Sequence, residues 1–292
     1  MNTLENKVFF SINGVSNINA AVLLENALIP KLSIKKPIDF THYQQTFDTV
    51  IQEMRNGNTY LLNLTFPTEI TVNTSLKNIF LLSKAKFKLY FQDKFIVFSP
   101  ERFVKIEDNI IKTFPMKGTI DAAIPNAQQI ILANEKEQAE HVMVVDLLRN
   151  DLAMVAKQVR LQRFRYVEKI KAGAKELLQI SSEISGILGK NWQHCLGDIL
   201  LTLLPAGSIS GTPKKKTLEI IKTVENVENY ERGFFTGIFG YFDGENLDSA
   251  VAIRFIERQA DKLFYKSGGG ITIDSEAETE YQELLAKVYI PV

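Results

Sequence analysis

The sequence has almost no cysteine and no long apolar run. Cys195 is the single cysteine among 292 residues, so no disulfide can form within the chain. That count fits a reducing compartment, and we expect a cytoplasmic protein. No stretch reaches about 18 uninterrupted apolar residues, and the N-terminus does not join a basic segment to a long apolar one. We therefore expect neither secretion nor a membrane span.

The chain also lacks an excess of charge of either sign. Its 34 Lys and Arg residues balance its 34 Asp and Glu residues. A neutral chain does not present the basic field that nucleic acid or an anionic membrane attracts. We therefore expect no nucleic-acid partner and no membrane partner.

Several common catalytic signatures are missing as well. There is no His-Glu-x-x-His, and Gln138 stands three residues before His141, where a di-iron helix would need glutamate. Gly268-Gly269-Gly270 is neither a GxGxxG fingerprint nor a Walker loop. Cys195 follows His194, but no orienting third group is nearby, so we interpret it as an ordinary thiol. Zinc, di-iron and thiol chemistry are not indicated.

The apolar pattern predicts antiparallel sheets with helices over one face, an α/β protein of the α+β type. The expected helices cover 42–56, 126–157, 166–189, 195–204, 213–224 and 276–287. The expected strands cover 59–70 with a break at Pro67, four segments of one meander within 87–114, a hairpin of 234–242 with 249–257, and 263–266 ending at three glycines.

The sequence indicates a joint within the chain between two prolines. Pro30 and Pro37 enclose three lysines. We interpret this stretch as the end of a short N-terminal segment, 1–37, before one compact domain, 38–292.

An acid and an amine flank the hairpin that we expect around Asp108. Antiparallel pairing would bring Glu101 and Lys117 to the same end of that hairpin. A carboxyl group and an amine held there could act as acid and nucleophile on one substrate. The alternative is a surface ion pair at a sheet edge.

Two pairs of glutamates have helical spacing. Glu137 and Glu140 lie three residues apart on one expected helix, and Glu280 and Glu283 repeat the spacing on the last one. Four converging carboxylates would repel each other unless a divalent cation neutralised them, and oxygen-only ligands suit Mg²⁺. The alternative is two solvated helix faces.

Three features could recognise an anion. The glycines 268–270 follow a strand, Gly211-Thr212-Pro213 opens a helix, and Arg254 ends an apolar strand. Backbone N–H groups, a helix N-terminus and a guanidinium all suit a carboxylate. A structural ion pair is the alternative for Arg254.

Taken in order, these blocks resemble the chorismate-utilising enzymes, the family of anthranilate, aminodeoxychorismate, isochorismate and salicylate synthases. The resemblance extends from about Tyr43 to Lys287. It rests on an ordered series of motifs: Pro115-Met116-Lys117-Gly118-Thr119, Glu137-xx-Glu140-His141, Arg149-Asn150-Asp151, Gly207-Ser208-Ile209-Ser210-Gly211-Thr212-Pro213-Lys214, Ala252-Ile253-Arg254, Gly268-Gly269-Gly270 and Glu280-xx-Glu283-xxx-Lys287.

The resemblance implies a role for each matching residue. Glu101 matches the general acid, Glu140 and Glu283 the direct Mg²⁺ ligands, and Glu137 and Glu280 their water-bridged neighbours. The implied fold is two facing antiparallel sheets with helices outside. Positions that would contact chorismate are Gly118, Thr119, Ser210, Phe235, Arg254, Gly268, Gly269, Gly270 and Lys287.

Two positions choose among the family's reactions. Water-adding members carry a lysine base where this chain has Leu61, and anthranilate synthases carry alanine where it has Lys117. The lysine resembles the aminodeoxychorismate synthases of the folate branch, which precede p-aminobenzoate. Two departures are Phe235, which lacks the usual hydroxyl, and Gln179, which replaces a histidine associated with aromatising elimination.

The resemblance thus implies an enzyme that makes 4-amino-4-deoxychorismate from chorismate and ammonia with Mg²⁺. Lys117 would form a covalent adduct, and a separate glutamine amidotransferase would supply ammonia. The alternatives are component I of anthranilate synthase and a non-catalytic subunit that binds chorismate or Mg²⁺.

Overall fold

A computed structural model describes residues 8–18, 28–172, 175–226 and 230–292. The chain forms two compact units. Unit 1 combines Met1–Pro100, Ile209–Phe239 and Val251–Val292, and unit 2 combines Glu101–Ser208 with Gly240–Ala250. The boundary at residue 37 and the single domain over 38–292 stay predictions, and part of the segment 1–37 lies outside the described residues.

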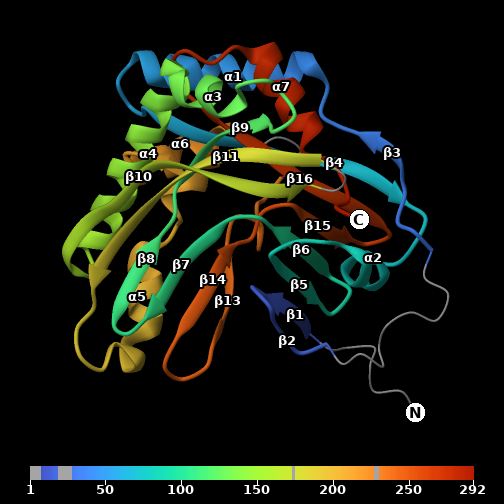
Figure 1. Cartoon of the computed structure of the whole chain (residues 1–292). Coiled ribbons are helices and arrows are strands. Elements are labelled where there is room, and N and C mark those ends of the chain that lie inside the picture. The colour runs from blue at the N-terminus through green and yellow to red at the C-terminus, as the bar shows by residue number, and fades with distance from the viewer. Residues whose placement is uncertain (1–7, 19–27, 173–174, 227–229) are drawn as a thin grey trace. The chain divides into compact units, whose positions relative to one another are not determined.

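Unit 1 is built on an antiparallel sheet that has nine strands within the described residues (Figure 1). Along the sheet the order is β12-β4-β16-β15-β6-β5-β1-β2, and β3 also pairs with β4. The strands are β1 (Val8–Ile12), β2 (Val15–Ser16), β3 (Leu32–Lys36), β4 (Leu61–Val72), β5 (Phe87–Phe91), β6 (Phe95–Ser99), β12 (Gly211–Thr212), β15 (Phe255–Gln259) and β16 (Lys262–Ile271).

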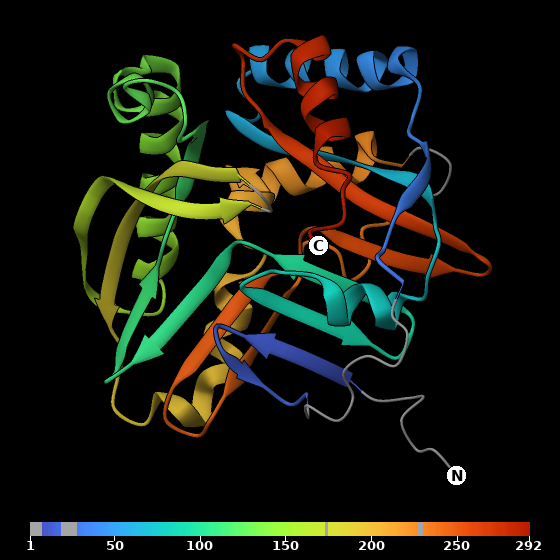
Figure 2. The same cartoon turned by 45° about the vertical axis from the view of Figure 1, so that its right-hand side comes forward.

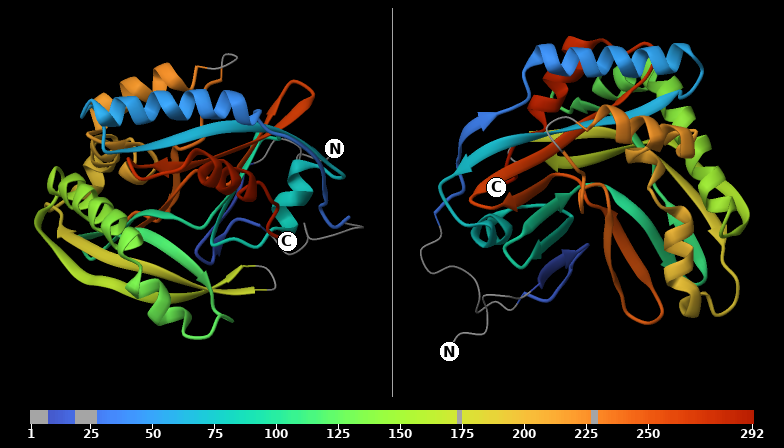
Figure 3. Two further views of the ribbon diagram at one scale, coloured as in Figure 1. Left: turned by 90° about the horizontal axis from the view of Figure 1, so that it is seen from above. Right: turned by 180° about the vertical axis from the view of Figure 1, so that it is seen from behind.

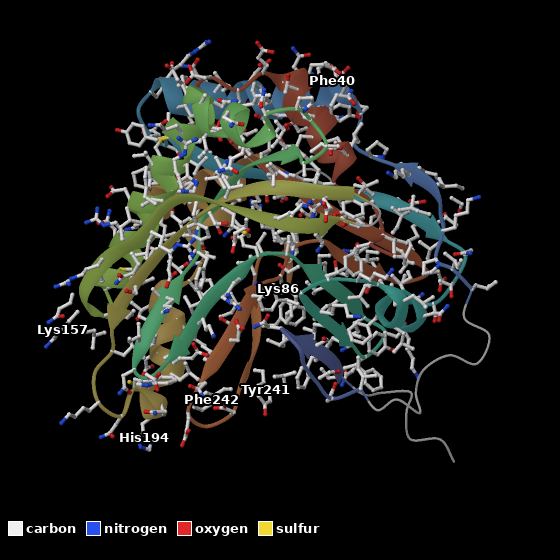
Figure 4. All side chains as sticks on the ribbon, in the orientation of Figure 1. Phe40, Lys86, Lys157, His194, Tyr241 and Phe242 are labelled. Carbon is white, nitrogen blue, oxygen red and sulfur yellow. The ribbon has the colours of Figure 1, made fainter. Side chains whose placement is uncertain are left out.

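Helices α1 (Phe40–Arg55) and α7 (Ala277–Ala286) lie side by side in unit 1, and α1 runs along β4 (Figures 1 and 3). Asp39 caps α1 by accepting the N–H of His42. Phe40, labelled in Figure 4, lies 5.3 Å from the ring of Tyr281 on α7. The buried face of α1, with Phe47 and Val50, joins the same core cluster. The helix predicted over 42–56 is therefore confirmed, and the further helices of unit 1 are α2 (Leu76–Leu82) and α6 (Lys214–Val224).

The expected break of β4 at Pro67 is wrong. On one edge of β4, Pro67 pairs with Lys266 of β16. On the other edge, β3 pairs with Glu69–Val72 and β12 pairs with Leu61–Leu62, so neither strand reaches Pro67. A proline without an N–H fits a strand where one side carries no ladder. The strand therefore continues through the proline.

The sequence predicts that the strand before the glycine triplet ends at the three glycines, and this prediction is wrong. Gly268, Gly269 and Gly270 lie inside β16 and pair with Thr65, Leu64 and Asn63 of β4. A Cβ on Gly268 would lie 2.3 Å from the carbonyl oxygen of Leu64, so no side chain fits there. The triplet allows two strands to approach closely, a role of glycine that composition does not distinguish from a loop.

Unit 2 is built on an antiparallel sheet that has seven strands among the residues described. Its order is β10-β11-β8-β7-β14-β13, and β9 also pairs with β11. The strands are β7 (Arg102–Glu107), β8 (Ile110–Thr113), β9 (Met116–Asp121), β10 (Lys157–Ala172), β11 (Lys175–Ile187), β13 (Ile238–Phe242) and β14 (Leu247–Val251). Figure 4 labels Tyr241 and Phe242 on β13, and the ring of Phe242 lies 5.8 Å from that of Trp192.

The helix predicted over 166–189 is wrong, because that region forms β10 and β11. The two long strands pair with each other and pack beside α4 (Glu135–Ala153; Figure 2). Ile180 and Ile184 are buried on β11. A four-residue spacing of apolar side chains fits one face of a helix and one face of a strand equally well. The sequence pattern could therefore not separate the two structures here.

The other predicted helices of unit 2 are largely confirmed. The segment 126–157 divides into α3 (Ala127–Ala133) and α4 at Asn134, whose side chain accepts the N–H of Glu137 and so starts the second helix. The helix expected over 195–204 is α5 (Leu196–Leu203). No helix among the described residues is both long and apolar enough to cross a membrane.

The single meander predicted within 87–114 is also wrong, although its four strands are present. β5 and β6 pair in unit 1, whereas β7 and β8 pair in unit 2. The chain changes sheet at Pro100 and Glu101. Local turn signals predict where a strand ends but not which sheet the next strand joins.

Candidate active site

In unit 2, Lys117 of β9 meets Glu140 of α4. The Nζ atom of Lys117 lies 2.8 Å from Oε2 of Glu140, and the two side chains are 27% and 15% exposed. The strand is held by pairing with β11, and the helix by a buried face that includes Val144 and Leu148. The ion pair therefore joins two elements that are fixed independently.

Gly118 allows this arrangement. Its φ is +83°, a conformation that favours glycine, and a Cβ built on it would lie 3.4 Å from Oε2 of Glu137. The next residue, Thr119, pairs with Gln179 of β11. Glu137, Gly118 and Lys117 thus lie close together beside the N-terminal half of α4.

Glu101, the predicted general acid, has a different partner. Ser208, in a short 3₁₀ turn (Gly207–Ile209), donates its hydroxyl to Oε1 of Glu101 at 2.5 Å. The hairpin expected to join Glu101 with Lys117 is shorter than predicted, because β7 pairs with β8 over Lys105–Glu107 and β9 pairs with β11. The sequence motif containing Ser208 was recognised, but the hydroxyl's contact with Glu101 was not.

His141 is a residue whose position the sequence did not reveal. Its side chain is fully buried, and Nε2 lies 2.6 Å from the hydroxyl of Ser182. Burial, with smaller contributions from the positive charges of Arg165 and Lys117, lowers the pKa of His141 to about 4. The imidazole is therefore neutral near pH 7 and adds no positive charge beside Lys117. In the sequence, the only signal for His141 is its place after Glu140, and this does not indicate which way the imidazole points.

In unit 1, a second lysine and glutamate meet on α7 and its C-cap. Nζ of Lys287 lies 2.6 Å from Oε1 of Glu283, one turn away, and donates to the carbonyl of Gly268 at 2.7 Å. Glu280 accepts the hydroxyl of Ser275 at 2.8 Å. A Cβ on Gly269 would lie 3.2 Å from Oε2 of Glu280, so α7 and the glycine strand are in close contact.

Arg254 supports the same end of unit 1. Its φ is +53°, and its NH1 donates to the carbonyl of Lys287 at 2.9 Å, while its guanidinium lies 5.0 Å from the ring of Tyr289. Arg254 therefore has a structural contact, but its partner is a backbone carbonyl and not the carboxylate that a structural ion pair would require.

The two remaining predicted contact residues are buried in unit 1. Phe235 packs 5.9 Å from the ring of Phe255. The backbone carbonyl of Ser210 accepts the N–H of Asn63. A Cβ on the next residue, Gly211, would collide with the carbonyl of Leu61, so only glycine fits there. Leu61, whose side chain cannot activate water, is itself buried in β4.

The structure thus gathers the predicted residues into two groups. Unit 2 holds Glu101, Lys117, Gly118, Thr119, Glu137 and Glu140. Unit 1 holds Ser210, Phe235, Arg254, Gly268, Gly269, Gly270, Glu280, Glu283 and Lys287.

Each group includes one of the two glutamate pairs that the sequence predicts as metal ligands. Within the described residues, no cluster of three or more His, Cys, Asp or Glu side chains is close enough to hold a metal ion. Each pair nevertheless offers oxygen donors alone, the type that Mg²⁺ prefers, and each includes a carboxylate paired with a lysine. The donor type fits Mg²⁺.

The chain matches known proteins over nearly its whole length. The family of chorismate binding enzymes matches residues 16–291. An "Uncharacterized PabA-like protein" of Haemophilus influenzae is 52% identical over 291 residues, which cover 100% of this chain and 87% of that protein. "Aminodeoxychorismate synthase component 1" of Bacillus subtilis is 30% identical over 272 residues, 88% of this chain and 56% of that protein.

A solved structure agrees with the fold. Anthranilate synthase component I from Streptococcus pneumoniae superposes with a TM-score of 0.76 at 26% identity, covering 92% of this chain and 61% of that chain. This likeness confirms the expected fold class, with two antiparallel sheets and helices. With the ordered motifs and the two groups of site residues, these matches show that the chain belongs to the family of chorismate binding enzymes.

Proposed function

We propose that this protein is an aminodeoxychorismate synthase component I, which converts chorismate and ammonia to 4-amino-4-deoxychorismate. The observation that carries the proposal is Lys117, placed on β9 with its amine 2.8 Å from Glu140. An amine at this position can serve as a nucleophile, which alanine cannot. The similarity to the Bacillus subtilis enzyme supports the same reaction.

The proposed chemistry consists of two displacements. The neutral amine of Lys117 attacks C2 of chorismate, the two ring double bonds shift, and the C4 hydroxyl departs as water with the proton of Glu101. Ammonia then bonds to C4, the double bonds shift back, and the C2–nitrogen bond breaks to release Lys117 as an amine. Two inversions give retention, and Glu101 regains a proton from the new ammonium group or from water.

Lys117 must lose a proton before it attacks. In the structure its amine is paired with Glu140, which stabilises the charged form. Chorismate is itself a dianion and would add to that stabilisation. We infer that the lysine becomes reactive only when another cation compensates Glu140.

The two glutamate pairs are the proposed ligands of that cation. Glu140 and Glu283 would bind Mg²⁺ directly, with Glu137 and Glu280 holding its waters. When bound, the ion would hold the C1 carboxylate of chorismate and draw electron density from the ring. Within unit 1, Lys287, Arg254 and the glycine strand would keep Glu280 and Glu283 in place.

Ammonia is proposed to come from a separate glutamine amidotransferase. Such an enzyme needs an activated cysteine, whereas the single cysteine here, Cys195, donates its thiol to the carbonyl of Trp192. The chain therefore offers no glutaminase nucleophile of its own. We propose that the protein acts with this partner in the cytoplasm, on the path to p-aminobenzoate and folate.

The test is to incubate the purified protein with chorismate, Mg²⁺ and ammonium at mildly alkaline pH and to identify the product by mass spectrometry. We expect 4-amino-4-deoxychorismate, with its pyruvyl group retained. Anthranilate would instead indicate the activity named for the Streptococcus pneumoniae relative. Unchanged chorismate, also after addition of an amidotransferase and glutamine, would indicate a binding subunit.

A further inference from the structure

Glu101 is held at two points, its backbone and its side chain. Its neighbour Arg102 makes two hydrogen bonds to Asp248 of β14, at 2.7 and 2.9 Å, and this pair is largely buried. The backbone at Glu101 is therefore tied to the unit 2 sheet. The side chain is held separately, because Oε1 accepts the hydroxyl of Ser208 at 2.5 Å.

The turn that carries Ser208 is held against α4. A Cβ on Gly207 would lie 2.8 Å from the side chain of Leu147 and 3.1 Å from Oδ2 of Asp151, so only glycine fits without a shift. Ala206 before it is also buried. The turn therefore has little freedom, and it presents Ser208 to Glu101 from a position packed against α4, the helix that bears Glu137 and Glu140.

A fixed hydroxyl has a specific consequence for a general acid. A carboxylic acid carries its transferable proton on one of two oxygens. If Ser208 donates to Oε1, the proton is directed to Oε2 and the rotation of the carboxyl group is restricted. Proton transfer depends on such positioning, since a donor misplaced by about 1 Å can cost on the order of 100-fold in rate.

We propose that Ser208 is a positioning residue for Glu101: its hydroxyl fixes the carboxyl group so that Oε2 delivers the proton to the departing C4 hydroxyl. The inference rests on the proposed function, which makes Glu101 the general acid. It adds a residue to the reaction that was not among the predicted contacts.

The variants Ser208→Ala and Ser208→Thr test this role. We expect Ser208→Ala to lower kcat by about 10- to 100-fold while KM for chorismate changes by less than about threefold, because the group acts on proton transfer and not on binding. Ser208→Thr keeps the hydroxyl and should restore most of kcat. Ser249→Ala is the matched control, since Ser249 bonds to the carbonyl of Val104 in the same unit and should leave kcat unchanged.

A double-mutant cycle separates positioning from a structural effect. Once Glu101→Gln has removed the acid, Ser208→Ala should cause no further loss of kcat. The same fractional loss in both backgrounds, or a kcat for Ser208→Ala within twofold of wild type, would overturn the inference. Thermal unfolding of each variant confirms that it is folded.

The product of the wild-type protein distinguishes a failure of this inference from a failure of the proposed function. Anthranilate as the product would overturn the proposed function, while the ratio between the Ser208 variants would still decide the inference. No turnover by the wild type would overturn both. Normal formation of 4-amino-4-deoxychorismate together with an unaffected Ser208→Ala variant would overturn the inference alone.

Discussion

The two units use the same pair of residue types in different ways. In unit 2, Lys117 and Glu140 come from a strand and a helix 23 positions apart, and both are largely buried. In unit 1, Lys287 and Glu283 lie one turn apart, and the glutamate is 54% exposed. The first pair is made by tertiary packing, whereas the second would form in any helix that carried this spacing.

The two lysines also differ in what else they contact. Lys287 donates to the carbonyl of Gly268 and so ties the end of α7 to β16. Lys117 extends from a strand position whose neighbour, Gly118, brings the backbone close to Glu137. We infer that the unit 1 lysine mainly shapes a binding surface and that the unit 2 lysine takes part in chemistry.

The largest predicted effect tests that division directly. Lys117→Ala should lower kcat for 4-amino-4-deoxychorismate on the order of 1,000-fold or more, because it removes the proposed nucleophile. Stopped assays with product identification by mass spectrometry measure the loss. Lys112→Ala is the matched control, since Lys112 forms a 3.0 Å pair with Glu183 in the same sheet and has similar exposure.

A Lys117→Ala variant that keeps its activity would contradict the covalent mechanism. Production of anthranilate by that variant would show that the lysine selects the product without being required for turnover. A loss of activity in Lys112→Ala as well would mean that ion pairs in this sheet act through folding.

The next effect concerns the other lysine. Lys287→Met should raise KM for chorismate about tenfold and change kcat by less than about threefold, because it loosens the glycine strand but leaves the reacting groups in place. Initial rates over a range of chorismate concentrations separate the two constants. A fall of kcat as large as that of Lys117→Ala would remove the distinction between the units.

Much of the site could be predicted because its chemistry is carried by short motifs. Glu137 and Glu140 lie on one helix as their spacing predicts, and the helix expected over 276–287 is found as α7, between Ala277 and Ala286. The pairing of Lys117 with Glu140 did not follow from spacing, because it depends on β9 leaving the hairpin for β11. Which strand a segment joins is decided by packing that a local pattern does not contain.

The same limit explains the errors in the fold. The segment 166–189 has apolar spacing that suits a helix, but it forms two strands whose long mutual pairing decides the structure. The Ser208 contact was missed for a related reason. It joins positions 107 residues apart, and no periodicity predicts such a contact.

The smallest predicted effect is on metal binding in the absence of substrate. If Lys117 and Mg²⁺ compete for Glu140, then Lys117→Met should bind Mg²⁺ about fivefold more tightly than wild type, within the energy of a partly exposed ion pair. Lys287→Met should gain about twofold or less, because Glu283 is more exposed and its pair is screened by water. Calorimetric titration with Mg²⁺ measures both, and Lys112→Met should show no change. Equal gains for the two variants would mean that burial does not distinguish the pairs, and weaker binding by Lys117→Met would mean that the lysine helps to hold the site open for the ion.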